Sequence, residues 1–292
     1  RFRNVTGVQT CALPISMRFL VHHRTRYRYS APVRLGPHLL RFNPRGDGVT
    51  VLSRSLIVAP EPVGWREVVD LFGNPVTELE FEGTSTQLCI DSTFDLETAA
   101  PPPVDGHATP DLPWSALDAD LTVYLAAESA IDPTVKSFAR DLAEASGWSA
   151  RGFLERLNRT LHDRTRHHIR HGGFAQAPAV TLASGAGACR DTAMLFIAAA
   201  RALGIPARFV SGYQARAETA DGGRHLHAWP EVHLPGLGWR GYDPTHGLEV
   251  EDGHVALCAA PDQVGTMPLE GGFWGDGVTS TLDYVVRIEA EE

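Results

Sequence analysis

The stretch from residue 184 to 213, SGAGACRDTAMLFIAAARALGIPARFVSGY, constrains the fold more than any other part of the chain. Between Ala188 and Leu203 the polar side chains are Arg190, Asp191, Thr192 and Arg201. So narrow a polar face predicts a helix that is buried on nearly all sides. Gly204 can cap this helix, Pro206 prevents its continuation, and residues 207–213 then predict a strand.

Cys189 lies at the start of this predicted helix. The helix dipole and the free N–H groups at a helix N-terminus favour the thiolate, which is the nucleophilic form of cysteine. A lone cysteine can equally be a core residue. Small residues flank this one, and histidine and aspartate follow in a fixed order, so the sequence favours a nucleophile.

His227 and Asp243 are the candidate partners of this thiol. Residues 225–234, HLHAWPEVHL, alternate like a strand, and WRGYDP follows after a PGLG turn. If the two strands form a hairpin, the histidine and the aspartate can be neighbours on one face. The aspartate would accept the Nδ1–H of His227 and hold the ring in place. A cysteine, a base and an orienting carboxylate are what acyl transfer requires.

Two segments, GACRDTAMLFIAAARALGIPARFVSGYQ and HLHAWPEVHLPGLGWRGYDPTHG, resemble the core of the bacterial transglutaminase-like superfamily. The resemblance implies Cys189 as nucleophile, His227 as base and Asp243 as acid, in a papain-like core whose cysteine helix packs on an antiparallel sheet. The HAW element selects His227 over the reserve candidate His225 and the more distant candidate His246. Position in the strand does not select among them.

The first part of the chain, residues 17–98, is strand-like, with a turn signal at FGNP. Its HHRTRYRYSAPV and LFGNPVTELEF segments resemble the domain that often precedes this core in bacteria. We therefore expect an α+β protein with four parts. They are a non-native or disordered leader over residues 1–16, an N-terminal β-sandwich over 17–98, a linker over 99–113 and the catalytic core over 114–292.

Within that core the sequence predicts helices over residues 114–130, 134–146 and 151–166, the last capped by Ser149. It predicts a loop over residues 171–183, and strands over HVALCAA and residues 281–289. The backbone N–H of Cys189 is one expected oxyanion donor, by analogy with cysteine hydrolases. Gln176, Trp114 and Trp148 are the candidates for the second donor, and the sequence does not choose among them. Asp191 is expected to stabilise the first turn of the cysteine helix.

The net charge of −9 argues against a nucleic-acid or anionic-membrane partner, and no apolar run approaches membrane-spanning length. Four cysteines without CxxC spacing exclude a disulfide framework. Cys89 and Cys258 are interpreted as core residues, and Cys11 falls in the leader. A reactive thiol suits a reducing compartment, so we expect a cytoplasmic protein.

The predicted activity is acyl transfer through a thioester, on a glutamine carboxamide or a peptide or isopeptide bond of a protein or peptide substrate. Whether water or an amine receives the acyl group stays open. The alternatives are a catalytically silent binding scaffold, a zinc site of Cys189, His227 and Asp243, and an acetyltransferase that uses coenzyme A. The zinc site lacks paired-ligand spacing and the acetyltransferase lacks a phosphate-binding loop, so we expect no metal and no cofactor.

Overall fold

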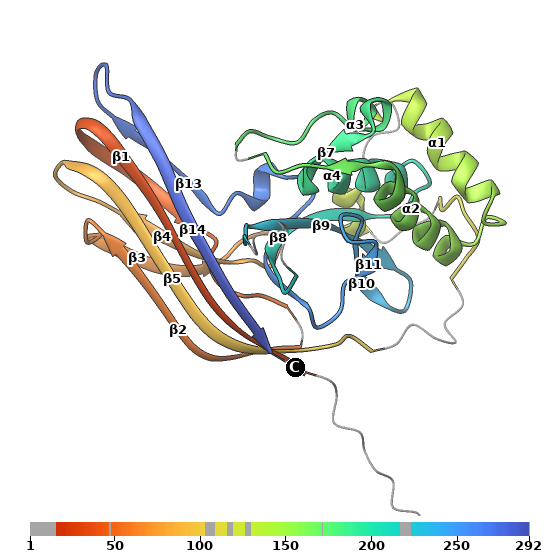
Figure 1. Ribbon diagram of the computed structural model, residues 1–292, viewed down its shortest axis with the longest axis horizontal. Helices are drawn as coiled ribbons and strands as arrows, with labels where there is room; N and C mark the ends of the chain where they lie inside the picture. Colours follow the sequence, from red (N-terminus) through yellow and green to blue (C-terminus); the bar gives the residue numbers. More distant parts are fainter. Residues whose placement is uncertain are drawn as a thin grey trace, which may run out of the picture.

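The computed structural model describes residues 16–46, 48–102, 109–115, 119–125, 130–170, 172–216 and 223–291. A long curled antiparallel sheet lies on one side and a mixed α+β core lies on the other (Figure 1). The α+β class predicted from the sequence, with an N-terminal β domain before the core, is confirmed. The predicted leader lies outside the described residues, except for Ser16.

The curled sheet is built around β1 (Ser16–Leu40), which is long enough to belong to both of its halves. The first half of β1 pairs with β5 (Ser85–Ala99), and β2 (Val49–Ala59) continues the sheet beyond β5. The second half pairs with β4 (Pro75–Glu80), followed by β3 (Gly64–Val69). Buried side chains from β1, β2, β4 and β5 form one cluster, so the two halves fold over a shared core.

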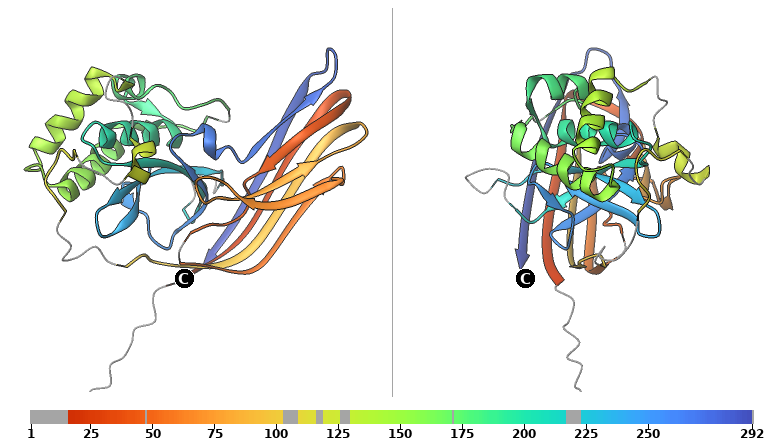
Figure 2. Two further views of the ribbon diagram at one scale, coloured as in Figure 1. Left: turned by 180° about the vertical axis from the view of Figure 1, so that it is seen from behind. Right: turned by 90° about the vertical axis from the view of Figure 1, so that its right-hand side faces the viewer.

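The last two strands of the chain return to this sheet, and the division into a core over residues 114–292 is corrected accordingly. β14 (Ser280–Glu291) pairs with β1 from Arg18 to Tyr29, and β13 (Leu269–Trp274) pairs with its second half. Figure 2 shows β14 alongside β1 over most of its length. Strand pairing across more than 200 residues of chain depends on tertiary packing, so the local sequence pattern could not place these strands.

The core contains four α-helices among the described residues, α1 (Pro133–Glu144), α2 (Ala150–Arg164), α3 (Pro178–Ser184) and α4 (Cys189–Arg201). Asp132 caps α1 and Ser149 caps α2 through their side chains, as expected of such residues at the N-cap. The helix α3 lies in a segment predicted to be a loop. In the described part of residues 114–130 the predicted helix is only the 3₁₀ turn η1 (Ala119–Tyr124).

The core sheet runs in the order β11-β10-β9-β8-β12, and every pair in it is antiparallel. Its strands are β8 (Ala207–Gln214), β9 (His227–Leu234), β10 (Gly238–Asp243), β11 (Leu248–Glu249) and β12 (His254–Ala260). The predicted hairpin of β9 and β10 is confirmed. Helix α4 packs across β9 and β8 in the largest buried cluster, as its apolar sequence predicted.

The position of Gly204, just beyond α4, accepts only glycine without strain. Its φ is +78°, and a Cβ there would lie 2.1 Å from the backbone oxygen of Trp114. Only glycine adopts this conformation easily and permits so close a backbone contact. The end of the cysteine helix is therefore fixed against the segment that enters the core.

The curled sheet and the core share a hydrophobic cluster. Phe19, Val21, Phe94, Leu96, Val286 and Ile288 come from the curled sheet, and Tyr213, Val255, Leu257 and Cys258 come from the core. The Tyr213 hydroxyl also lies 2.7 Å from Nδ1 of His23 on β1. A shared buried core of this kind holds two parts of a chain in one arrangement, because separating them would expose its apolar area to water.

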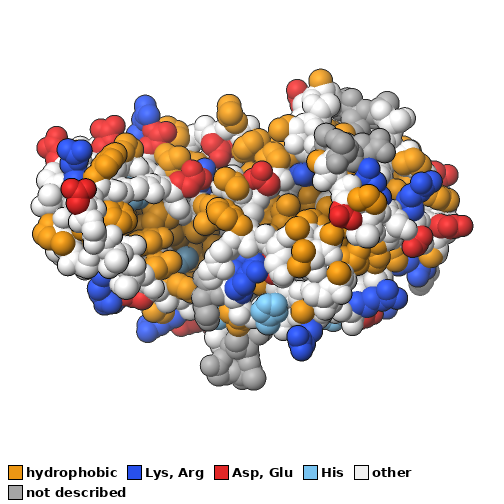
Figure 3. Space-filling model, turned by 90° about the horizontal axis from the view of Figure 1, so that it is seen from above, with side chains coloured by type: hydrophobic (Ala, Val, Ile, Leu, Met, Phe, Trp, Pro, Cys, Tyr) orange, Lys and Arg blue, Asp and Glu red, His pale blue; other side chains and the backbone are white. Residues whose placement is uncertain are grey.

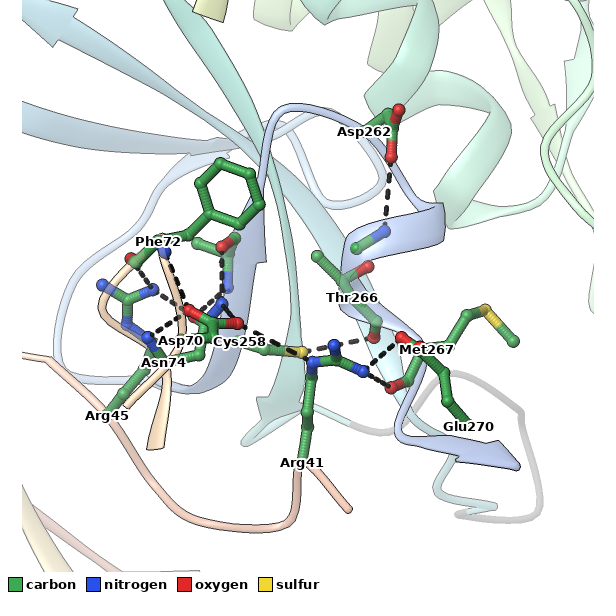
Figure 4. Close-up of polar contacts among 12 residues, drawn as sticks. Arg41, Arg45, Asp70, Phe72, Asn74, Cys258, Asp262, Thr266, Met267 and Glu270 are labelled. Atoms are coloured by element: carbon green, nitrogen blue, oxygen red, sulfur yellow. Dashed lines mark hydrogen bonds and ion pairs between the residues drawn. The ribbon is translucent and has the colours of Figure 1, made fainter. Parts of the chain in front are cut away.

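Asn74 adds a polar clamp between the two parts, drawn in Figure 4. Its amide nitrogen donates to the Ala259 carbonyl at 2.9 Å, and its amide oxygen accepts from the Ala259 N–H at 2.7 Å. Arg45 also donates to the same oxygen, and Asp70 holds the turn through the N–H of Asn74 at 2.9 Å. Through Asn74, the turn FGNP therefore provides hydrogen-bond partners for both the N–H and the C=O of Ala259 on the outer edge of β12.

Replacing Asn74 with alanine should destabilise the protein by roughly 2–4 kcal/mol, because two buried backbone groups of Ala259 lose their partners at about 1–3 kcal/mol each. Equilibrium urea unfolding measures this loss. The control is Gln87→Ala, since this exposed amide on β5 should leave stability within about 0.5 kcal/mol. Equal stability of the two variants would refute the clamp.

No helix of the described residues combines the length and the apolar character that crossing a bilayer requires.

Candidate active site

Cys189 is the first residue of α4, directly after the short strand β7 (Ala186–Gly187). Its side chain is buried, with 8% of its surface exposed at the wall of a cavity. The Ala188 N–H donates to the Asp191 carboxylate at 2.8 Å, which fixes the backbone just before the thiol. Asp191 therefore serves the first helical turn, as the sequence predicted.

Asp191 does more than cap the helix. It is fully buried, and it accepts the Gln176 N–H at 2.8 Å and an Arg170 N–H at 2.7 Å. Burial raises the pKa of this carboxyl, but the hydrogen bonds from Gln176 and Ala188 and the charge of Arg170 together lower it below 3.8. An ionised carboxylate thus ties Arg170 and Gln176 to the cysteine end of α4.

His227, the first residue of β9, and Asp243, the last residue of β10, meet as a buried pair. Nε2 of His227 lies 2.9 Å from Oδ2 of Asp243. The prediction that Asp243 accepts from Nδ1 is wrong, because Nε2 is the ring nitrogen that faces Asp243 on β10. Cys189 lies close enough to this ring to affect its pKa, and both side chains line the cavity described below.

Each member of this pair stabilises the charged form of the other. Burial lowers the pKa of His227, but the charge and hydrogen bond of Asp243 and the contact with Cys189 outweigh it and raise the pKa well above 6.5. Burial raises the pKa of Asp243, yet His227 and two further histidines bring it well below 3.8. At neutral pH the arrangement therefore favours an imidazolium between the carboxylate and the sulfur.

The Asp243 carboxylate has further hydrogen-bond partners besides His227. Its Oδ2 also lies 2.9 Å from Nδ1 of His246 and 3.1 Å from Nε2 of His254, and its Oδ1 accepts the Thr245 N–H at 2.9 Å. His246, the distant candidate for the base, is thus a neighbour of the carboxylate. His254 was missed, because its place depends on β12 joining β8.

The reserve candidate His225 also lines the cavity of Cys189, and its Nδ1 lies 3.3 Å from the Tyr284 hydroxyl. His227, Asp243 and His246 hold ligand-type atoms within 4.8 Å of one another, which is the candidate metal group among the described residues. It does not include Cys189, so the predicted alternative of a cysteine-containing zinc site does not match it.

A cavity of about 340 Å³ opens in front of Cys189 and His227. Its walls come from both parts of the molecule: β1, β14 and the segment before β13 on one side, and α4, β8 and β9 on the other. Seen from above, hydrophobic side chains line the hollow between the curled sheet and the core (Figure 3). The thiol therefore faces a mainly apolar space of the size that binds small ligands or parts of peptides.

His167 also lines this cavity and was missed by the sequence analysis. It belongs to the short strand β6 (Arg166–His167), which pairs in parallel with β7 and so sets it opposite Gly187, two residues before the cysteine. Burial, with smaller contributions from His227 and His246, lowers its pKa to about 4. At neutral pH it presents an uncharged imidazole.

The candidates for the second oxyanion donor are positioned elsewhere. The Gln176 amide donates to Asp191 at 3.1 Å, and the Trp114 indole donates to the Pro110 carbonyl at 3.0 Å. Trp148 packs against the buried core rather than on the cavity. The N–H of Cys189 lies at the first helical position, where the helix itself offers no acceptor.

Comparisons with known proteins identify the family of this chain. Residues 19–97 match the family model of the bacterial transglutaminase-like N-terminal region, and residues 137–244 match that of the transglutaminase-like superfamily. An uncharacterized protein of Mycobacterium tuberculosis is 30% identical over 95% of both chains. An uncharacterized protein of Mycobacterium leprae is 26% identical over 93% of this chain and 98% of its own.

Among solved structures, one from Cytophaga hutchinsonii described as a "putative cysteine protease" superposes with a TM-score of 0.72. It covers 95% of this chain and 92% of its own, at 20% sequence identity. The likeness therefore includes the curled sheet and its C-terminal strands as well as the core, and at this identity it concerns the fold.

Proposed function

Because the chain belongs to the bacterial transglutaminase-like superfamily, we propose that it is an enzyme that transfers acyl groups through a thioester. Its acyl donor is a glutamine carboxamide or a peptide or isopeptide bond in a protein or peptide. Cys189 is the nucleophile, His227 the acid and base, and Asp243 the residue that orients the imidazole. The observation that carries the proposal is that Cys189 and His227 line one cavity while Asp243 lies 2.9 Å from Nε2 of the buried His227 ring.

In the first half of the reaction the Cys189 thiolate, paired with protonated His227, attacks the carbonyl carbon, and the carbonyl oxygen becomes an oxyanion. The N–H of Cys189, unused by the helix, is placed to stabilise that charge. The C–N bond then breaks, and the leaving nitrogen takes the proton held by His227. The products are a thioester on Cys189 and free ammonia or amine, with neutral His227 beside it.

In the second half His227 removes a proton from water or an amine as it attacks the thioester carbonyl. The C–S bond breaks, the sulfur leaves as a thiolate, and the imidazolium is restored. Water yields a carboxylic acid, and an amine yields a new amide. Throughout, buried Asp243 fixes the ring and stabilises its positive charge, because it accepts the Nε2–H.

Incubating the purified protein with a library of glutamine-containing peptides, with and without a primary amine, tests this proposal. Mass spectrometry separates the outcomes: a gain of one mass unit for deamidation, a larger gain for amine incorporation, and shorter peptides for cleavage. Any of these products that Cys189→Ala fails to form supports the proposal. Absence of all three products across the library would support a silent scaffold instead.

A further inference from the structure

The cavity in front of Cys189 has one wall that belongs to the curled sheet. Side chains at alternate positions of a strand share a face, so His23, Thr25 and Tyr27 of β1 point the same way. In the register of the sheet, Thr25 lies opposite Tyr284 and Tyr27 lies opposite Leu282. All five residues line the cavity. Two neighbouring cross-strand pairs of β1 and β14 thus face the reactive thiol across the hollow.

This wall is uncharged. Nδ1 of His23 is 2.7 Å from the Tyr213 hydroxyl, its Nε2 is 3.1 Å from the Thr25 hydroxyl, and burial lowers its pKa to about 4, so it is neutral. The Tyr284 hydroxyl contacts His225. With the polar atoms of His23, Thr25 and Tyr284 engaged, the wall offers mainly ring faces and aliphatic carbon to whatever enters the cavity.

Leu282 is the exposed element of the wall. It is 50% exposed, on a strand whose inward-facing residues closer to the C-terminus, Val286 and Ile288, are buried between the two parts. Covering this half-exposed leucine with an apolar group of a ligand would be favourable, because it removes apolar surface from water.

We propose that the wall formed by Tyr27, Leu282 and Tyr284 binds an apolar side chain of the acyl donor. The enzyme then selects peptides that carry an aliphatic or aromatic residue next to the reacting carbonyl. The inference rests on the proposed function and assigns the curled sheet a part in substrate selection. It also explains why the C-terminal strand returns to β1: the wall requires residues from both ends of the chain.

The test uses covalent probes of Cys189, so it does not depend on turnover. Peptidyl acyloxymethyl ketones with leucine or with aspartate beside the ketone, and the small reagent iodoacetamide, are compared by second-order labelling rates. We expect the leucine probe to react faster than the aspartate probe. Leu282→Ala should reduce the leucine-to-aspartate ratio about tenfold, since losing a small apolar group from a pocket changes selectivity by roughly 10–200-fold. The iodoacetamide rate should be unchanged.

Leu20→Ala is the matched control, because Leu20 is a leucine of the same sheet with 49% exposure that does not line the cavity. It should leave the ratio unaltered. If Cys189 reacts with iodoacetamide but Leu282→Ala leaves the peptide preference intact, the wall is not a specificity surface and the proposed function is untouched. If Cys189 reacts with neither class of reagent, both the proposed function and this inference are wrong.

Discussion

Cys189→Ala should abolish turnover, with a loss of at least about 10⁴-fold, because the thioester cannot form without the sulfur and removal of a catalytic nucleophile costs several powers of ten. The small change at the start of α4 should leave the fold intact, since the hydrogen bond to Asp191 comes from the Ala188 N–H and does not involve the side chain of residue 189. Steady-state rates on a peptide identified from the library measure the loss.

Cys89→Ala is the control for this variant, because Cys89 is a free cysteine on β5 that does not line the cavity. It should keep full activity. Turnover by Cys189→Ala at the rate of the unmodified protein would remove the nucleophile from the mechanism. Adding a second substitution at Asp243 should lower the residual rate little further, because members of one catalytic unit are not additive.

Asp243→Asn should have the next largest effect, a loss of about 10⁴-fold in kcat, as for the equivalent change in a serine protease triad. An amide would replace the carboxylate oxygen that lies within hydrogen-bond distance of three imidazoles. Burial lowers the pKa of His227, and the charge of Asp243 is the main effect that raises it. Without that charge the pKa of His227 should fall. The imidazolium would then be less available to protonate the leaving nitrogen.

Two measurements separate this effect from a loss of structure. Circular dichroism should report a folded variant, and the pH below which His227 is protonated, followed by NMR of the ring protons, should shift downward. Asp141→Asn, the same change at an exposed position on α1, should alter neither activity nor titration. A folded Asp243→Asn protein with full activity would contradict the orienting role.

The sequence predicted those features that depend on neighbouring residues. The apolar run of α4, its glycine and proline stop, and the PGLG turn between β9 and β10 are local signals, and each marks an element of the structure. The chain order of Cys189, His227 and Asp243 then named the buried histidine–aspartate pair and a cysteine that lines the same cavity as the histidine. The family resemblance, rather than position in the strand, separated His227 from His225.

Features created by distant pairing could not be predicted in this way. His254 reaches Asp243 only because β12 joins β8, and β14 reaches β1 across almost the whole chain. The choice of Nε2 over Nδ1 at His227 depends on the ring orientation that the assembled sheet imposes. The place of His167 depends on the two-residue strand β6, which no periodic pattern can reveal.

The central claim is that an imidazolium is held beside the Cys189 sulfur, and the rate of iodoacetamide alkylation at pH 6 tests it most directly. Mass spectrometry would follow the adduct on Cys189 in the unmodified protein and in His227→Ala. An adjacent positive charge favours the thiolate by about one to three powers of ten. We therefore predict that the unmodified protein reacts at least about tenfold faster. Equal rates, or a faster variant, would contradict the account.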